Sequence, residues 1–175
     1  MNLRTCLHKK CAHKLVKTGS KIELYIRPAA LPEKEQETKQ NDDILKGIHI
    51  LLVEDNELNT YVAKTILEQY SCIVDTAENG MAAITKFERS EENFYDVILM
   101  DVHMPVMDGI EATKRIRALE RSDAAAVPII AMTAEAFDRE KAQTLDAGMN
   151  AHIAKPIVVE ILKKAIRSQL EKATA

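Results

Sequence analysis

Short apolar runs alternate with helical patterns along residues 44–175. Apolar runs that predict strands cover residues 48–53, 72–76, 95–100, 128–132 and 151–154. Apolar residues at helical spacing follow each of these runs and predict helices over residues 57–69, 81–89, 109–119, 135–146 and from 158 onward. Strands alternating with helices of this length form parallel βαβ units, and near-continuous apolar strands need helices on both faces. The pattern therefore predicts an α/β domain with a five-stranded, doubly wound parallel sheet.

The first 43 residues follow a different pattern. Apolar residues at steps of four predict a short basic amphipathic helix: Leu3, Leu7, Cys11 and Leu15. Residues 22–26 alternate between apolar and polar, which predicts a half-buried strand. The proline-containing polar stretch over residues 28–43 predicts a linker. We therefore expect residues 1–43 to be a basic segment with a linker, and residues 44–175 to be the main domain.

Charge is distributed unevenly between these parts. Residues 1–30 hold seven Lys or Arg and one acid, whereas residues 44–175 hold 15 basic and 21 acidic residues. An acidic main domain disfavours nucleic acid as its direct partner. The chain has no apolar run long enough to span a membrane and no N-terminal signal-peptide pattern, so we expect a cytoplasmic protein.

Four of the predicted strands end in residues that can do chemistry. The first ends at Glu54 and Asp55, the third at Asp101, the fourth at Thr133 and the fifth at Lys155. Parallel strands bring these ends to one edge of the sheet, where ligands bind. Clustered carboxylates need a hard cation such as Mg²⁺, and a carboxylate can attack phosphorus to form an aspartyl phosphate. Mg²⁺ and the lysine would neutralise phosphoryl charge, and the threonine hydroxyl could donate to a phosphoryl oxygen.

Four blocks of sequence resemble the response-regulator receiver family in order and spacing. They are LVEDN at residues 52–56, MDVHMPVMDG at 100–109, AMTA at 131–134 and KP at 155–156. The resemblance spans about residues 47–170 and implies a flavodoxin-like (βα)5 fold with strand order 2-1-3-4-5. It also implies that Asp101 accepts a phosphoryl group from a phosphohistidine.

The resemblance further implies roles for the residues around Asp101. Asp55 and Asp101 would bind Mg²⁺ directly, together with the backbone carbonyl of His103, while Glu54 would act through water. Lys155 would pair with the phosphoryl group and precede a cis bond to Pro156.

Two more features of the family bear on signalling and on the lifetime of the phosphate. The family often has Tyr or Phe three residues before the lysine as a switch that moves with Thr133, whereas this chain has His152. In the family, the side chains two residues after the acceptor aspartate and two residues after the threonine flank the path of the water that hydrolyses the aspartyl phosphate. Here they are His103 and Glu135, so we expect both to tune the lifetime of the phosphate.

The sequences of these motifs are most similar to those in the C-terminal receiver of a hybrid sensor histidine kinase. Residues 18–28 weakly resemble the closing strand of a kinase ATP-binding domain, but the sequence shows no ATP lid and no phosphoacceptor-histidine helix. Without these parts we expect that the chain is not a kinase by itself. The 20 residues after Lys155 suffice for one helix, so we expect no one-piece transcription factor either.

The resemblance also predicts the partners of the chain. We expect it to exchange phosphate with a histidine kinase or a histidine phosphotransfer domain. The contact would be made through the helix after Asn56, at Leu58, Tyr61 and Val62. A weak homodimer is left open.

Two alternatives use the same residues differently. A small phosphohydrolase with an aspartate nucleophile usually needs a second Asp two residues later, where this chain has His103. In such enzymes the nucleophile lies on the first strand, whereas Asp101 ends the third predicted strand. Steady turnover of a phosphate monoester would identify it. A receiver-like domain that only binds proteins would be expected to lack Asp101, Asp55 or Lys155, and all three are present.

Overall fold

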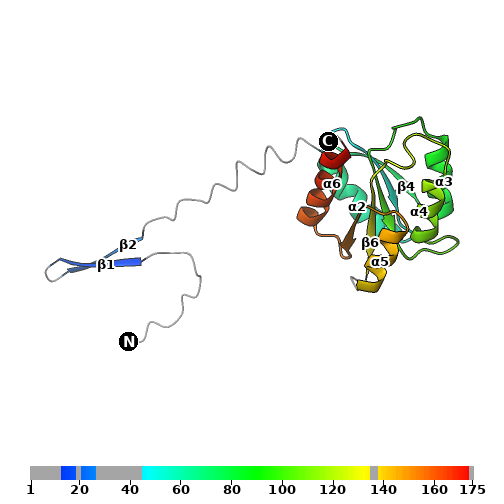
Figure 1. Ribbon diagram of the computed structural model, residues 1–175. Coiled ribbons are helices and arrows are strands. Elements are labelled where there is room, and N and C mark those ends of the chain that lie inside the picture. Colours follow the sequence, from blue (N-terminus) through cyan, green and yellow to red (C-terminus); the bar gives the residue numbers. More distant parts are fainter. Residues whose placement is uncertain (1–12, 19–20, 27–44, 135–137, 174–175) are drawn as a thin grey trace. The chain divides into compact units, whose positions relative to one another are not determined.

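A computed structural model describes residues 13–18, 21–26, 45–134 and 138–173 (Figure 1). The chain divides into two units, Met1–Asn41 and Asp42–Ala175. In the first unit, strands β1 (His13–Thr18) and β2 (Lys21–Ile26) pair antiparallel, with Leu15 opposite Leu24. The strand predicted from the alternation of residues 22–26 is confirmed.

The helix predicted over Leu3 to Leu15 is wrong at its C-terminal end, because Leu15 lies in β1. The earlier part of that prediction falls outside the described residues. The physical reason is pairing: β1 forms an antiparallel backbone ladder with β2. A four-residue apolar spacing carries no information about a strand partner further along the chain. The role of residues 1–43 as a basic segment and linker stays a prediction.

The second unit contains a five-stranded parallel sheet in the order β4-β3-β5-β6-β7. Counted within this sheet, the order is 2-1-3-4-5, so the predicted fold is confirmed. The strands are β3 (His49–Val53), β4 (Ile73–Ala77), β5 (Val97–Asp101), β6 (Ile129–Thr133) and β7 (Ala151–Ala154). The helices are α2 (Glu57–Gln69), α3 (Gly80–Arg89), α4 (Gly109–Arg117), α5 (Asp138–Asp146) and α6 (Val159–Ala173).

Successive residues of β3 enter two different cores. Ile50 and Leu52 pack in a cluster with α2 and α6, whereas Leu51 and Val53 pack in a cluster with α3 and α4. In Figure 1, α2 and α6 lie on one face of the sheet and α3 and α4 on the other. Neighbouring side chains of a strand point to opposite faces, so a strand buried on both sides must be apolar throughout.

Three helices begin close to the carboxyl ends of strands because each has a polar cap. In every case the cap side chain accepts a hydrogen bond from the backbone N–H three residues later. The caps are Asn56 of α2, Asn79 of α3 and Asp108 of α4. Such caps satisfy N–H groups that have no partner within the helix. The caps fix the residue at which each helix begins and therefore the length of the loop between the strand and that helix.

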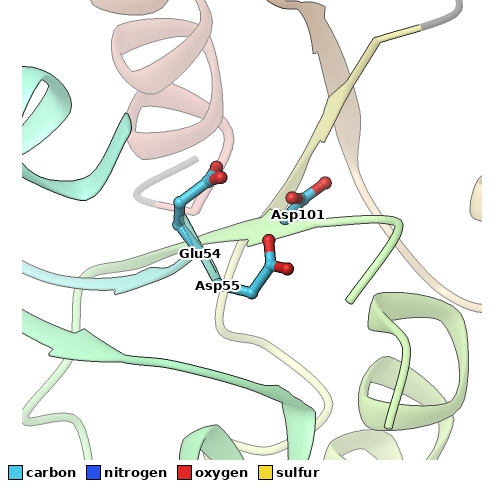
Figure 2. A group of neighbouring side chains, drawn as sticks. All are labelled: Glu54, Asp55 and Asp101. Atoms are coloured by element: carbon cyan, nitrogen blue, oxygen red, sulfur yellow. The ribbon is translucent and has the colours of Figure 1, made fainter. Parts of the chain in front are cut away.

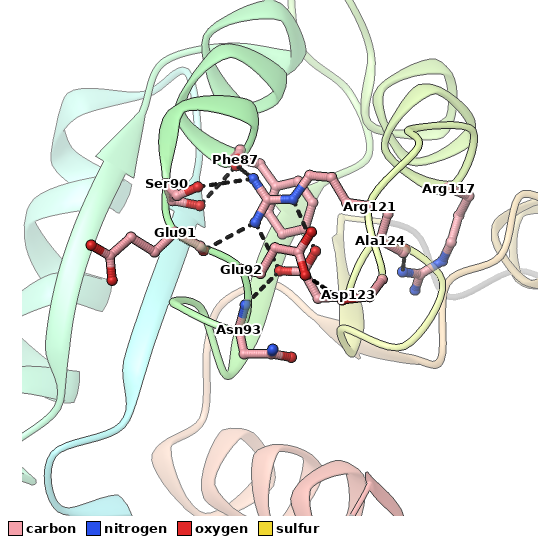
Figure 3. Close-up of polar contacts among 10 residues, drawn as sticks. Phe87, Ser90, Glu91, Glu92, Asn93, Arg117, Arg121, Asp123 and Ala124 are labelled. Carbon is pink, nitrogen blue, oxygen red and sulfur yellow. Dashed lines mark hydrogen bonds and ion pairs between the residues drawn. The ribbon is translucent and has the colours of Figure 1, made fainter.

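Arg121 ties together two loops that lie away from this edge (Figure 3). Its guanidinium donates to the backbone carbonyls of Phe87, Ser90 and Glu91 and to the carboxylate of Asp123. It also lies 4.4 Å from the centre of the Phe87 ring. The Arg121 and Asp123 side chains are only 12% and 4% exposed, so this ion pair is largely shielded from water.

We expect Arg121→Ala to destabilise the domain by about 3 kcal/mol, because the buried Asp123 carboxylate loses its cationic partner and keeps the hydrogen bond from the backbone N–H of Asn93. Hydrogen bonds from Arg121 hold the pKa of Asp123 below its ordinary value. The pair therefore stabilises the fold fully above the ordinary carboxyl pKa, and this contribution is lost as the pH falls through the lowered pKa. Urea unfolding at neutral and acid pH should show the difference between parent and variant shrinking in acid.

The matched control is Arg115→Ala, which removes an arginine from an exposed ion pair with Glu111. This change is expected to cost about 0.5 kcal/mol or less. If the two variants lose the same free energy of unfolding, the shielded ion pair contributes no more to stability than the exposed one.

Candidate functional site

The predicted site residues meet at the carboxyl edge of the sheet. Glu54 and Asp55 follow β3, Asp101 ends β5, Thr133 ends β6 and Lys155 follows β7. After β3 the chain moves outward to β4 and then returns to form β5 on the other side of β3. The acidic residues therefore lie where the direction of winding reverses, which is the usual ligand position in doubly wound sheets.

Three carboxylates form a cluster at this reversal. One oxygen from each of Glu54, Asp55 and Asp101 lies within 4.8 Å of the other two. Figure 2 shows Glu54 and Asp55, which follow β3, beside Asp101 at the end of β5. Glu54 and Asp101 are 3% and 5% exposed, whereas Asp55 is exposed. One edge of the cluster is thus open to solvent while two of its members are held within the protein.

Lys155 neutralises part of this negative charge. Its Nζ lies 2.6 Å from Asp101 Oδ2 and 2.5 Å from Glu54 Oε2. Burial raises the pKa of Asp101 above its usual range, although hydrogen bonding and attraction to Lys155 oppose the change. Burial also works against the charge of Lys155, but its bonds to Asp101 and Glu54 outweigh this effect and raise its pKa. The lysine is therefore a cation fixed against the proposed acceptor.

Two further groups orient the buried carboxylates. Asn59 Nδ2 donates to Glu54 Oε1 over 2.8 Å, and the backbone N–H of His103 donates to Asp101 Oδ1 over 3.2 Å. The sequence reasoning missed Asn59. Its position one turn after the Asn56 cap was the available signal, because the first turn of α2 faces the same edge of the sheet.

The Thr133 hydroxyl is buried and points to a residue that the sequence reasoning also missed. It donates to a carboxylate oxygen of Glu140 in α5, and the other oxygen of Glu140 lies 2.6 Å from His103 Nε2. Glu140 thus links the end of β6 with the loop after β5. The predicted use of the His103 backbone carbonyl as a metal ligand stays a prediction.

The remaining predicted residues have different outcomes. The Lys155–Pro156 peptide bond is cis, as predicted. His152 lies in β7, half-buried, and burial, with a smaller contribution from Lys141, lowers its pKa. Its part in a switch with Thr133 stays a prediction. Glu135 lies outside the described residues, so the expected effect of His103 and Glu135 on phosphate lifetime is also still a prediction.

The fold and the site together define a class of protein. It is a flavodoxin-like domain with an acidic cluster and a lysine at the carboxyl edge of a five-stranded parallel sheet. The response regulator receiver domain matches residues 50–167. The chain therefore belongs to the response regulator receiver family of two-component systems.

Similar proteins include receivers within long kinases. Probable histidine kinase 1 of Oryza sativa subsp. indica is 39% identical over 150 residues, covering 69% of this chain and 15% of that protein. Hybrid signal transduction histidine kinase M of Dictyostelium discoideum is 41% identical over 122 residues, covering 67% of this chain and 5% of that protein. The chain therefore spans only a small part of these relatives.

Solved structures of receivers are similar as well. One is the receiver domain of the sensor histidine kinase PA1611 from Pseudomonas aeruginosa PAO1, described with a magnesium ion in its active-site cleft. Its TM-score is 0.65 and its identity 39%, covering 71% of this chain and 98% of that chain. The chemotaxis protein CheY4 of Vibrio cholerae gives a TM-score of 0.65 at 29% identity, covering 71% of this chain and 100% of that one.

The relation to hybrid histidine kinases expected from the sequence is thus confirmed at the level of the receiver. Among the residues described by the structure, no helix is long and apolar enough to cross a membrane.

Proposed function

We propose that this chain is a phosphoacceptor receiver in which Asp101 takes a phosphoryl group from a phosphohistidine. The observation that carries the proposal is the position of the Asp101 carboxylate, which lies within the acidic cluster and 2.6 Å from Lys155. A carboxylate in this setting is a nucleophile with a fixed cation beside it.

In the proposed transfer, an oxygen of Asp101 bonds to phosphorus as the phosphorus–nitrogen bond of the donor breaks. The imidazole of the donor keeps the electron pair of that bond. Lys155 remains close to the acceptor and balances the charge that the phosphoryl oxygens bring. The hydroxyl of Thr133, at the end of the neighbouring strand β6, can donate to one of these oxygens.

The donor set fits a magnesium ion. It consists of carboxylate oxygens only, and Asp55 provides a solvent-exposed side. Mg²⁺ prefers such oxygen ligands, keeps several waters and accepts phosphate oxygens. We infer that Asp55 and Asp101 would hold the ion, with Glu54 acting through water. When bound, Mg²⁺ would neutralise charge on the phosphoryl oxygens.

Asp55→Ala is expected to weaken Mg²⁺ binding more than Glu54→Ala. Both oxygens of Glu54 are already engaged, one by Asn59 and one by Lys155, whereas Asp55 is exposed beside the cluster. A direct ligand also contributes more than a group that acts through water. Titration of each variant with Mg²⁺ by calorimetry checks this order, and equal affinities would remove the distinction between the two residues.

The function itself is tested by incubating the chain with acetyl phosphate and Mg²⁺ and measuring its intact mass. One base-labile phosphoryl group per chain is expected. Steady release of phosphate from a monoester, without a labelled protein, would instead identify the phosphohydrolase alternative.

We also propose that the chain is the receiver of a hybrid histidine kinase and that its partner is a kinase or a histidine phosphotransfer domain. The similarity to receivers within long kinases supports this origin. Helix α2 supports the docking position, because Leu58 and Tyr61 are each 69% exposed and Val62 is 45% exposed. Apolar side chains grouped in this way on a surface indicate a protein contact.

Charged substitutions at Tyr61 and Val62 are expected to slow transfer from a phosphorylated protein donor by at least tenfold, the factor that corresponds to about 1.4 kcal/mol. Labelling by acetyl phosphate should be unchanged, because the small donor does not need the docking surface. The matched control is Met81→Glu, which places a charge at a residue of similar exposure (44%) on α3. If Met81→Glu slows transfer as strongly, the contact does not lie on α2.

A further inference from the structure

Glu140 joins three segments that meet beside the acidic cluster. It lies in the first turn of α5, accepts a hydrogen bond from the Thr133 hydroxyl and contacts His103 Nε2 at 2.6 Å. Its side chain is only 14% exposed, although the His103 ring is 70% exposed. Thr133 follows Met132, and Met132 pairs with Asp101 in the sheet. Glu140 therefore contacts the end of the strand beside that of the proposed acceptor and, through His103, the loop that follows the acceptor's own strand.

The Thr133 hydroxyl cannot serve two acceptors at once. It has a single proton to donate, and an ionised carboxylate can only accept. While this proton is shared with Glu140, it is not available to a phosphoryl oxygen on Asp101. Glu140 also adds a further negative charge near a group that must receive an anion, and like charges oppose each other.

We propose that Glu140 is a positioning residue that holds the Thr133 hydroxyl and the His103 side chain away from the acceptor until phosphorylation displaces it. The inference rests on the proposed function and adds a residue to it. A phosphoryl group on Asp101 and the carboxylate of Glu140 compete for the Thr133 hydroxyl, so each weakens the other's interaction by the same factor. The released group is the first turn of α5, and the chemical change on Asp101 is thereby linked to that helix.

The test uses beryllium fluoride with Mg²⁺ as a stable analogue of the phosphoryl group. Its affinity is measured for the parent chain, Glu140→Gln and Glu140→Ala. Glutamine can still accept from Thr133 but carries no charge, whereas alanine removes the contact. Affinity should rise in the order parent, Gln, Ala, with a gain of roughly tenfold for Ala, near the lower end of the range for a hydrogen bond to a charged group.

Two controls separate position from charge. Asp146→Ala removes an exposed carboxylate from the other end of α5 and should change the affinity less than twofold. In a Thr133→Ala background, Glu140→Ala should lose most of its gain, because the competing hydroxyl is gone. A gain of the same size in that background would show that Glu140 acts through charge alone and would overturn the proposal.

The remaining outcomes are also decisive. If the parent binds the analogue and the Glu140 variants bind it no better than Asp146→Ala, the positioning role is wrong while the proposed function stands. If the parent neither binds the analogue nor becomes labelled by acetyl phosphate, the proposed function fails and this inference fails with it. Thermal unfolding identifies a variant that does not fold, and Glu140→Gln, which keeps the size of the side chain, then decides.

Discussion

Asp101→Asn is expected to abolish labelling by acetyl phosphate or by a phosphorylated protein donor. The amide has nearly the same shape as the carboxylate but is not a nucleophile toward phosphorus. The fold should survive the change, because burial raises the pKa of Asp101 and thus already opposes its charge. Lys155 also keeps its second partner, Glu54, at 2.5 Å.

Intact mass after incubation with acetyl phosphate and Mg²⁺ measures the effect. The parent should gain one phosphoryl group that is lost in base, and Asp101→Asn should gain none. Asp146→Asn makes the same chemical change at an exposed position on α5 and should be labelled like the parent. If Asp101→Asn is labelled to the same stoichiometry as the parent, Asp101 is not the acceptor.

Gly109→Ala is expected to cost more than about 3 kcal/mol of folding free energy, the upper part of the usual range for overpacking. A Cβ at Gly109 would lie 2.1 Å from the backbone carbonyl oxygen of Asp101 and 2.9 Å from Met100 Cγ. The carbonyl cannot rotate away as a flexible side chain could. The N–H of Gly109 also donates to the carbonyl of Val102 over 3.0 Å, so α4 is held against the end of β5.

Urea unfolding followed by circular dichroism measures this loss. The matched control is Gly47→Ala, where φ is +78° but no atom lies within 4 Å of the added Cβ. That substitution should cost only the strain of a left-handed backbone, about 1 to 2 kcal/mol. Similar losses in the two variants would mean that the close approach to Asp101 is relieved at little cost.

The sequence alone was sufficient for the order and type of the elements in the main domain. The apolar runs around Leu52 and Leu99 identify strands because a strand buried on both faces is apolar at every position. The sequence was also sufficient to assign three residues to one site: Asp101, Thr133 and Lys155. Each ends a predicted strand, and parallel strands end at a common edge.

Only the tertiary structure decided which side chains touch within that site. Lys155 bridges Asp101 and Glu54, and Glu140 reaches Thr133 and His103 from α5. These contacts depend on how far a helix lies from the strand ends and how each side chain rotates. Hydrophobic periodicity reports neither quantity.

The same limit explains the error at Leu15. A four-residue apolar spacing is a local property, whereas β1 exists through its ladder with β2. The sequence by itself thus determined the elements, the sheet edge and the chemical groups that meet there. The hydrogen bonds among those groups and the pairing of β1 with β2 were decided by the tertiary structure. The free energy of such contacts depends on separation in three dimensions, which apolar spacing along the chain does not report.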